Sequence, residues 1–370
     1  MAKLIVEGLH KLNGAVGIHG AKNSALPVLA ATLLANSVSE IGNCPRLSDV
    51  DASVAILRCL GCQVDVRDHV VTVDPAGMCR CEIPDHLMRE MRSSIVFLGA
   101  IIAKCGEARM SFPGGCELGP RPIDLHLDAL EKLGVAIEEE RGHLRCRAKG
   151  RLKGTEISLA LPSVGATENV LLAAATADGT TVLHNAAREP EIEDLCGYLN
   201  ACGARIAVEK DGVITIEGVE ALHGCRHEVI PDRIETATYM AAAAVTGGTL
   251  LLRSARPEHV NTVFPAFEEA GCQVSVWKDE ILISAPSRLR RVKTIRTMPY
   301  PGFPTDAQAP LMAMACLADG TSVFIETIFE NRYKHAGELM RLGAKIKVEG
   351  RVAVVEGVPM LSGAPVECTD

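Results

Sequence analysis

Aromatic residues are scarce in this sequence. Phe, Tyr and Trp account for 3% of the chain, with one Trp among them, although hydrophobic residues as a whole reach 48%. Because large rings are so few, the core has to be built mainly from Ala, Leu, Ile and Val, all of which bury readily. At 370 residues the chain exceeds the usual size of a single core, so two domains are expected.

Long apolar runs are absent as well. Met1–Val6 contains no apolar core of the length found in a signal peptide. Ala237–Val245 is far too short to cross a membrane. The 14 cysteines of a chain with no export signal are expected to stay reduced, as in a cytosol. The sequence therefore predicts a cytoplasmic protein with no membrane partner, and it does not indicate an oligomeric state.

Motifs for nucleic acids, metals and dinucleotides are also missing. The formal net charge of −8 argues against general affinity for nucleic acid. The sequence has no GxxxxGK[ST] loop and no Gly-rich dinucleotide fingerprint, and we expect no pair of histidines at a metal-ligand spacing such as His-x-x-x-His. The closely spaced pairs Cys59/Cys62 and Cys79/Cys81 do not by themselves predict a structural metal site. We expect neither a metal nor an organic cofactor.

What the sequence does contain is an internal repeat. A glycine flanked by small or apolar residues follows an amphipathic helical pattern and precedes a strand pattern at intervals of about 70 residues. These glycines are Gly61, Gly134, Gly203, Gly271 and Gly343. In phase with them, Ala-rich helical patterns begin near Asn23, Arg92, Gly165, Ile234 and Thr305.

Each repeat predicts a helix, a strand, a second helix, a left-handed glycine C-cap and a β-hairpin, which together make a βαβαββ module. The hairpins are clearest at Ala204–Glu217 and Lys345–Val355, where Gly-containing turns interrupt the strand patterns. Cys62 and Cys272 occupy a small apolar position of this module, so they are predicted core residues. The predicted fold class is α/β (α+β), built from repeated βαβαββ units of about 70 residues.

Five complete copies of the module fit in the chain. Glu367–Asp370 resembles Phe303–Asp306 at the start of the fifth copy, so a sixth copy is expected to begin there. Six copies need about 420 residues, which predicts that about 50 residues of the sixth are lacking. We therefore interpret the chain as a truncated product or a fragment.

The segment Pro113–Pro122 combines one thiol with several glycines and prolines. Glycine lets a backbone approach a ligand closely, and proline limits how far a loop can move. Arg121 follows Cys116, and a nearby guanidinium favours the reactive thiolate. The segment predicts a directed loop that presents Cys116 to an anionic substrate. The alternative is a Gly-rich turn in which the cysteine has no role.

Helix starts in different repeats carry further polar residues. Lys22 and Arg92 stand where a cation is mildly unfavourable, so they are candidates for binding an anion and otherwise surface cations. Ser163 opens a helix whose first N–H groups could hold a phosphate; the alternative for Ser163 and for Asp306 is N-capping. Charged clusters at repeat junctions are predicted to cap helices or form ion pairs. They are Arg188–Glu191, Asp232–Glu235 and Glu330–Arg332.

Matches along the chain resemble one family, the UDP-N-acetylglucosamine 1-carboxyvinyltransferases (the MurA enolpyruvyl transferases). The resemblance covers essentially the whole length, and so many matches in one order argue against chance. The matching segments are Gly20–Pro27, Pro113–Cys116, Gly119–His126, Ser163–Thr167, Arg188–Glu191, Pro231–Thr236, Phe303–Asp306 and Phe329–Arg332.

The resemblance implies a two-domain, inside-out α/β barrel in which each domain has three βαβαββ units around a pseudo-threefold axis. One domain is expected at residues 22–230 and carries the Cys116 loop. The other is expected at residues 1–21 plus 231–370, discontinuous and truncated. The family binds its ligands between the domains, and the Cys116 loop is expected to close over them as a lid.

The implied reaction transfers the enolpyruvyl group of phosphoenolpyruvate to the 3′-hydroxyl of UDP-N-acetylglucosamine and releases phosphate, the first committed step of peptidoglycan precursor synthesis. The resemblance makes Cys116 the acid and covalent-adduct site and Asp306 the base. Lys22, Arg92 and Arg121 are expected to neutralise the phosphates, with Asn23 beside them, and Lys22 and Arg121 are also placed among the catalytic residues. The uridine-diphosphate pocket and the sugar contact are expected to use Arg121, Pro122, Ile123, Asp124, Leu125, Ser163, Val164, Gly165 and, at the sugar, Ile328.

The sequence departs from the family pattern in two places. Leu161 stands where some members have a Lys, so nucleotide contacts there have to come from elsewhere. The missing sixth unit carries another arginine for phosphoenolpyruvate, and its loss is expected to expose apolar surface and leave the chain poorly active or unstable. Two alternatives stay open: the sister 5-enolpyruvylshikimate-3-phosphate synthase, which lacks the Cys116 loop, and a catalytically impaired paralogue that binds nucleotide sugar.

Overall fold

The computed structural model describes residues 3–113, 123–209 and 211–368. The chain divides into two compact units. The 20–230 unit holds the described residues between Gly20 and Ile230, and the 231–370 unit combines the segment up to His19 with the chain from Pro231 onward. Each unit has its own hydrophobic core.

The 20–230 unit contains three copies of the predicted module. The first comprises α1 (Lys22–Ala31), η1 (Thr32–Leu34), β2 (Ser39–Gly42), α2 (Ser48–Leu60), β3 (Gln63–Arg67), β4 (Val70–Asp74) and η2 (Pro75–Gly77). The second comprises β5 (Glu82–Ile83), α3 (Asp85–Glu90), η3 (Arg92–Val96), α4 (Phe97–Cys105), β6 (Glu107–Ser111), α5 (Asp124–Lys132), β7 (Val135–Glu140) and β8 (His143–Ala148). The third comprises β9 (Glu156–Ser158), α6 (Val164–Ala174), β10 (Thr180–His184), α7 (Pro190–Ala201), β11 (Arg205–Val208), β12 (Ile214–Glu217) and β13 (Arg226–Glu228).

The described part of the 231–370 unit contains two further copies. The first of them comprises α8 (Arg233–Thr246), β14 (Thr249–Arg253), α9 (Pro257–Val260), η4 (Asn261–Val263), α10 (Phe264–Glu269), β15 (Gln273–Val276) and β16 (Glu280–Ser284), joined by β1 (Asn13–Gly17). The second comprises β17 (Thr294–Arg296), η5 (Thr305–Ala307), α11 (Gln308–Ala315), β18 (Thr321–Ile325), α12 (Lys334–Arg341), β19 (Lys345–Glu349) and β20 (Val352–Glu356).

The sheets of the described residues all have four strands in one order. A linker strand lies parallel to the first strand of the module. That strand pairs antiparallel with the second strand of the hairpin, and the first hairpin strand forms the edge of the sheet. In the sheet β13-β2-β4-β3, Arg226 lies opposite Glu40, so the end of the third module closes the 20–230 unit onto its first. In the other unit β1 supplies the linker strand to β14, which explains why this unit is discontinuous in sequence.

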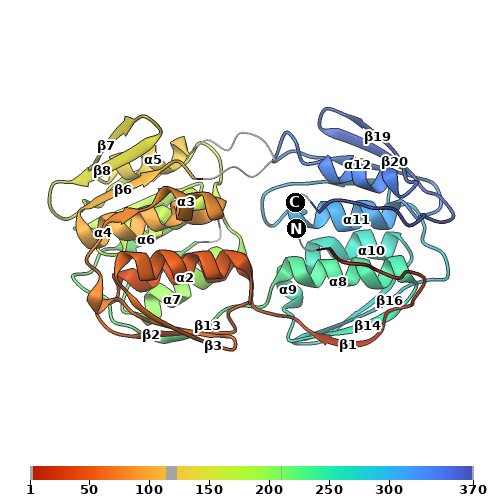
Figure 1. The fold of residues 1–370 in the computed structure, drawn as a ribbon, viewed down its shortest axis with the longest axis horizontal. Coiled ribbons are helices and arrows are strands. Elements are labelled where there is room, and N and C mark those ends of the chain that lie inside the picture. The colour runs from red at the N-terminus through yellow and green to blue at the C-terminus, as the bar shows by residue number, and fades with distance from the viewer. Residues whose placement is uncertain (1–2, 114–122, 210, 369–370) are drawn as a thin grey trace. The chain divides into compact units, whose positions relative to one another are not determined.

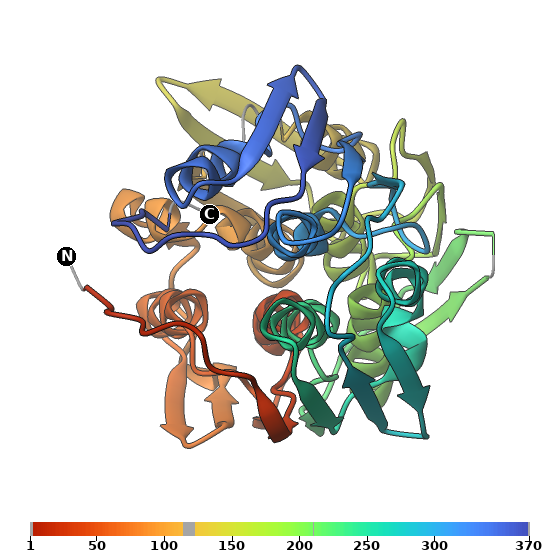
Figure 2. The same ribbon diagram turned by 90° about the vertical axis from the view of Figure 1, so that its right-hand side faces the viewer.

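The first helix of each module is apolar on almost every side and fills the interior of its unit. All residues of α1 from Ser24 to Ala31 are buried, and α4, which is buried from Phe97 to Ile102, packs against both α1 and α6. In the other unit α8 packs against α11. Figure 1 shows the helices of each unit lying between its sheets, and Figure 2 shows α8 and α11 nearly end-on with the β19–β20 hairpin outside them. Interior helices covered by small sheets are the predicted inside-out arrangement.

Local features predicted from the repeat are confirmed. The five repeat glycines have φ between 93° and 105°, the left-handed region that glycine tolerates and that ends the second helix of each module. The hairpins β11–β12 and β19–β20 lie where the turn residues predicted them. Cys62 and Cys272 are buried in the two cores. No helix in the described part of the chain is both long and apolar enough to span a membrane.

Candidate active site

Lys22 and Asn23 form the first turn of α1, as predicted. Lys22 Nζ lies 3.1 Å from Asp49 Oδ2, and 42% of the lysine side chain is exposed. Asp49 belongs to the first turn of α2, where a carboxylate is favoured by the helix dipole. The structure thus shows a half-exposed cation with a carboxylate partner.

The turn that carries Lys22 is tied to the end of the same unit by Asp194 of α7. The buried Asp194 carboxylate accepts hydrogen bonds from Ser24 Oγ, from Ile230 N at 3.3 Å and from His227 Nε2 at 3.0 Å. A buried carboxylate is tolerated only when its oxygens are bonded in this way. Sequence reasoning missed Asp194 because Ser24 is 170 residues away along the chain.

Three helix starts in the 20–230 unit bring predicted nucleotide-binding residues together. Helix α6 packs against both α5 and η3. Arg92 begins η3, Ile123 precedes α5, and Ser163 precedes α6. The predicted residues Asp124, Leu125, Val164 and Gly165 lie in the first turns of α5 and α6. Their first N–H groups have no partner within the helix, which suits such ends to anions.

His126 stands at the centre of this group, although the sequence analysis gave it no role. Its Nδ1 accepts a hydrogen bond from Asn169 Nδ2 at 2.8 Å, and Asn169 Oδ1 accepts one from Gly99 N. Burial, and then the charge of Arg92, lower the pKa of His126 to about 4. A Cβ added to Gly165 would lie 2.7 Å from His126 Cε1, so only glycine lets α6 approach the ring this closely.

The lowered pKa of His126 makes a stability prediction. His126 takes up a proton near pH 6.5 in the unfolded chain but only near pH 4 in the folded chain. Its contribution to the free energy of unfolding is therefore complete above pH 6.5 and is lost as the pH falls towards 4. We expect about 3 kcal/mol of the unfolding free energy to disappear across that window. His126→Gln keeps an acceptor for Asn169 and should lose less on acidification. Urea unfolding at pH 7 and pH 4.5 tests this, and equal losses in both proteins would contradict it.

The two predicted N-caps have different outcomes. Ser163 Oγ accepts a hydrogen bond from Ala166 N, so Ser163 does cap α6. Asp306 does not cap a helix, and that alternative was wrong. It lies inside the single turn η5, which Pro304 precedes, and its Oδ1 instead accepts a hydrogen bond from Arg332 Nη2 at 2.7 Å.

Asp306 borders a cavity of about 420 Å³ within the 231–370 unit, together with Arg332, His335 and Leu339. The Asp306 side chain is 40% exposed, whereas that of Arg332 is 7% exposed. The Arg332 guanidinium lies 5.6 Å from the centre of the Phe329 ring, a cation–π distance. The structure therefore shows a partly accessible carboxylate that a buried cation holds in place.

Two of the three junction clusters show the capping and ion pairs predicted for them, whereas in Arg188–Glu191 the side chain of Glu189, which precedes α7, forms no cap. Asp232 caps α8 by accepting hydrogen bonds from Ile234 N and Glu235 N. Glu330 pairs with Arg351 at 3.5 Å, and Arg332 pairs with Asp306. Ile328 lies in the loop between β18 and α12, with its N–H bonded to Glu326. Cys116, Arg121 and Pro122 lie outside the described residues, so their expected roles stay predictions.

A buried glutamate on α6 is a second feature that the sequence did not indicate. Glu168 lies one turn beyond Gly165 and is buried. Burial, and then the carboxylates of Glu191 and Glu189, raise the pKa of Glu168 well above its ordinary range. Burial thus favours the protonated form of Glu168 beside the predicted nucleotide-binding turn.

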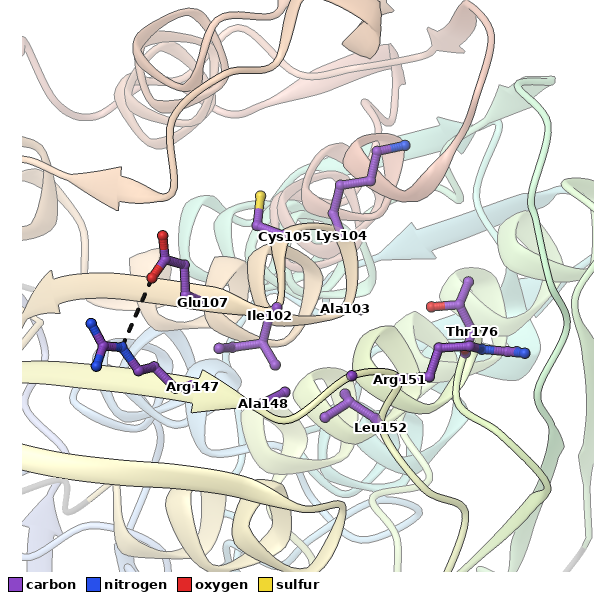
Figure 3. A pocket seen from close by; sticks show the side chains of 12 residues that line it. Ile102, Ala103, Lys104, Cys105, Glu107, Arg147, Ala148, Arg151, Leu152 and Thr176 are labelled. Atoms are coloured by element: carbon purple, nitrogen blue, oxygen red, sulfur yellow. Dashed lines mark hydrogen bonds and ion pairs between the residues drawn. The ribbon is translucent and has the colours of Figure 1, made fainter.

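A further cavity lies elsewhere in the 20–230 unit. It measures about 500 Å³ and is lined by Lys104, Cys105, Arg147, Arg151 and others, none of them predicted site residues (Figure 3). Its cations are engaged: Arg151 bonds to three backbone carbonyls, Lys104 to Ala35 O, and Arg147 to Glu107. This cavity is not an evident anion site.

Histidines and cysteines in the described residues form no group that could hold a metal ion. His223 and His227 do have a spacing of four, yet they do not share a helix. His227 bonds to Asp194, and His223 Nδ1 lies 3.1 Å from Gly224 O.

Comparison with known proteins places this chain in a family. The family model described as EPSP synthase (3-phosphoshikimate 1-carboxyvinyltransferase) matches residues 6–370. The enolpyruvyl transferase NikO from Streptomyces tendae has a similar structure, with a TM-score of 0.86 at 26% identity over 96% of this chain and 84% of that one. An EPSP synthase from Acinetobacter baumannii has a TM-score of 0.72 at 19% identity, over 96% of this chain and 84% of that one.

Curated relatives are more similar in sequence. UDP-N-acetylglucosamine 1-carboxyvinyltransferase 2 of Caldanaerobacter subterraneus subsp. tengcongensis is 51% identical over 370 residues, covering 100% of this chain and 88% of the relative. UDP-N-acetylglucosamine 1-carboxyvinyltransferase 1 of Symbiobacterium thermophilum is 49% identical over 371 residues, covering 99% of this chain and 84% of the relative. The chain therefore belongs to the UDP-N-acetylglucosamine 1-carboxyvinyltransferases, within the EPSP synthase family of enolpyruvyl transferases.

Proposed function

We propose that this protein transfers the enolpyruvyl group of phosphoenolpyruvate to the 3′-hydroxyl of UDP-N-acetylglucosamine and releases phosphate, as a step of peptidoglycan precursor synthesis in the cytoplasm. The observation that carries the proposal is the 51% identity, along the full length of this chain, to a UDP-N-acetylglucosamine 1-carboxyvinyltransferase. The sister 5-enolpyruvylshikimate-3-phosphate synthase has weaker support, because the EPSP synthase structure is only 19% identical.

The chemistry requires an acid and a base. A proton has to reach C3 of phosphoenolpyruvate while the sugar hydroxyl attacks C2, and a base then removes a C3 proton as phosphate leaves. We assign the acid and covalent-adduct role to Cys116 and the base role to Asp306. Arg332, 2.7 Å from Asp306, supplies a counter-charge to that carboxylate and holds one of its oxygens.

Binding of two anionic substrates requires cations and N–H groups. We assign Lys22, Arg92 and Arg121, with Asn23, to the phosphates, because oriented charges in a site of low dielectric stabilise developing negative charge. The helix starts around His126 are assigned to the uridine diphosphate, through Pro122, Ile123, Asp124, Leu125, Ser163, Val164 and Gly165. Ile328 is assigned to the sugar. The two units are proposed to act as the two domains of the enzyme.

The proposal predicts release of inorganic phosphate from phosphoenolpyruvate only when UDP-N-acetylglucosamine is present. The measurement is a phosphate assay with and without the sugar nucleotide, using Cys116→Ser as the matched variant. Loss of release in the variant would support the assigned acid. Release that does not depend on the sugar nucleotide, or that shikimate 3-phosphate supports equally, would contradict the proposed substrate.

The same assay separates the enzyme from the impaired paralogue. Binding of UDP-N-acetylglucosamine by calorimetry without any phosphate release would favour a protein that binds nucleotide sugar and does not turn it over. A folded chain that neither binds nor reacts would exclude both functions.

A further inference from the structure

Glu326 is a buried carboxylate that the proposed chemistry does not use. It is the first residue after β18 and is 1% exposed. Its Oε1 accepts hydrogen bonds from Thr297 Oγ1 at 2.8 Å, from Ile328 N at 2.8 Å and from Phe329 N at 3.1 Å. Its Oε2 accepts one from Thr305 Oγ1 at 2.9 Å. These donors satisfy a charge that would otherwise be costly to bury.

Comparison between the modules indicates that the fold does not require a carboxylate here. The residue after the corresponding strand is Asn43 after β2, Asn185 after β10 and Ser254 after β14, all with positive φ. Asn43 Nδ2 donates to Val229 O, and Asn185 Nδ2 donates to Leu159 O, each 2.8 Å away. Val229 and Leu159 directly follow a linker strand, as Thr297 does. In two other modules a neutral amide therefore bonds to the residue at this position, as a donor to its backbone carbonyl, whereas Glu326 accepts from the Thr297 hydroxyl.

The extra bonds of Glu326 lead to Asp306 by two routes. Thr305, which donates to Oε2, is the first residue of η5 and directly precedes Asp306. Phe329, whose N–H donates to Oε1, lies under the guanidinium of Arg332, and Arg332 bonds to Asp306. One carboxylate thus fixes both the turn that carries Asp306 and the loop that supplies its counter-ion.

We propose that Glu326 is a positioning residue, which holds Thr305 and the loop Ile328–Phe329 so that the Asp306 carboxylate is presented in one orientation. The inference rests on the proposed function only in taking Asp306 as the base. Positional errors of about 1 Å at a reacting group can cost on the order of 10²-fold in rate, so the tether is expected to act on kcat.

Two isosteric variants separate positioning from stability. Thr305→Val removes the single bond from η5 to Glu326. Thr297→Val also removes one hydrogen bond to Glu326. In addition, it removes the hydroxyl that accepts a hydrogen bond from Thr327 N at 2.9 Å. A purely structural role predicts greater damage in Thr297→Val. Positioning predicts a fall in kcat of about 10-fold or more in Thr305→Val, little change in KM for UDP-N-acetylglucosamine, and less than about threefold loss of kcat in Thr297→Val.

Substitution of Glu326 itself completes the test. In Glu326→Gln the amide oxygen can keep the Oε1 contacts and the NH₂ can donate to Thr305 Oγ1, so most of kcat should return relative to Glu326→Ala. Losses of kcat that simply follow the losses of melting temperature across the four variants would overturn the proposal. So would a full kcat in Glu326→Ala.

A readout without turnover keeps the two proposals distinguishable. The ¹³C carboxyl resonance of Asp306, assigned with Asp306→Asn, is expected to shift in Thr305→Val and to stay in place in Thr297→Val. If the parent chain releases no phosphate, the proposed function fails, and this spectrum still tests the tether. An unchanged resonance in Thr305→Val would overturn the positioning role.

Discussion

Asp306→Asn is expected to lower kcat for sugar-dependent phosphate release on the order of 10³-fold. The amide cannot accept the C3 proton, yet its oxygen can still accept the hydrogen bond from Arg332 that the carboxylate accepts at 2.7 Å. Binding of UDP-N-acetylglucosamine should therefore change little. The test is steady-state phosphate release together with calorimetric binding of the sugar nucleotide.

A matched control is available in the same unit. Asp319 also pairs with an arginine, Arg288, at 3.8 Å, but the pair lies on the surface. Exposed pairs contribute about 1 kcal/mol or less, so Asp319→Asn should leave kcat and melting temperature nearly unchanged. Retention of a tenth or more of the parent kcat by Asp306→Asn would remove this residue from the role of base.

The architecture could be predicted because its signals are local. A glycine after an amphipathic helix marks a left-handed C-cap wherever it occurs, and the observed φ of 105° at Gly61 and 95° at Gly343 follows from that rule. Turn residues set the hairpins in the same way. Because aromatic residues are few, the sequence predicted interior helices rich in Ala. Helix α1, which is buried from Ser24 to Ala31, is one of them. Repetition of these signals specified the module and its number of copies.

The side chains that support the site could not be predicted, because their partners are distant in sequence. In the sequence, Asp194 and Glu326 are ordinary charged residues. The fold brings Ser24, 170 positions away, beside Asp194, and it brings Thr305, 21 positions away, beside Glu326. His126 lay in a recognised segment, but its neutrality depends on burial and on Arg92. The alternative that Asp306 caps a helix was wrong, because capping was inferred from residue type, whereas a cap also requires the position just before the turn.

The second large effect is expected at Lys22. Lys22→Ala removes a cation from the first turn of α1 and should reduce kcat/KM for phosphoenolpyruvate by about 10²-fold or more, since oriented charge at a phosphate is among the larger catalytic contributions. Lys22→Arg keeps the charge but changes its geometry, so it should recover only part of the loss. Initial rates at varied phosphoenolpyruvate, measured at low and high salt, test this.

The ion pair between Lys22 and Asp49 provides the decisive control. Because α1 packs against α2, the 3.1 Å contact could simply join two helices, in which case removing either partner should cost the same. With 42% of the lysine side chain exposed, such a pair contributes about 1 kcal/mol or less to stability. Asp49→Asn is therefore expected to alter kcat/KM less than about fivefold, because the proposed function makes the substrate phosphate, and not Asp49, the partner of Lys22 during turnover. Equal losses in Lys22→Ala and Asp49→Asn would show that Lys22 acts by holding α1 against α2, and only an asymmetric result supports direct binding of the anion.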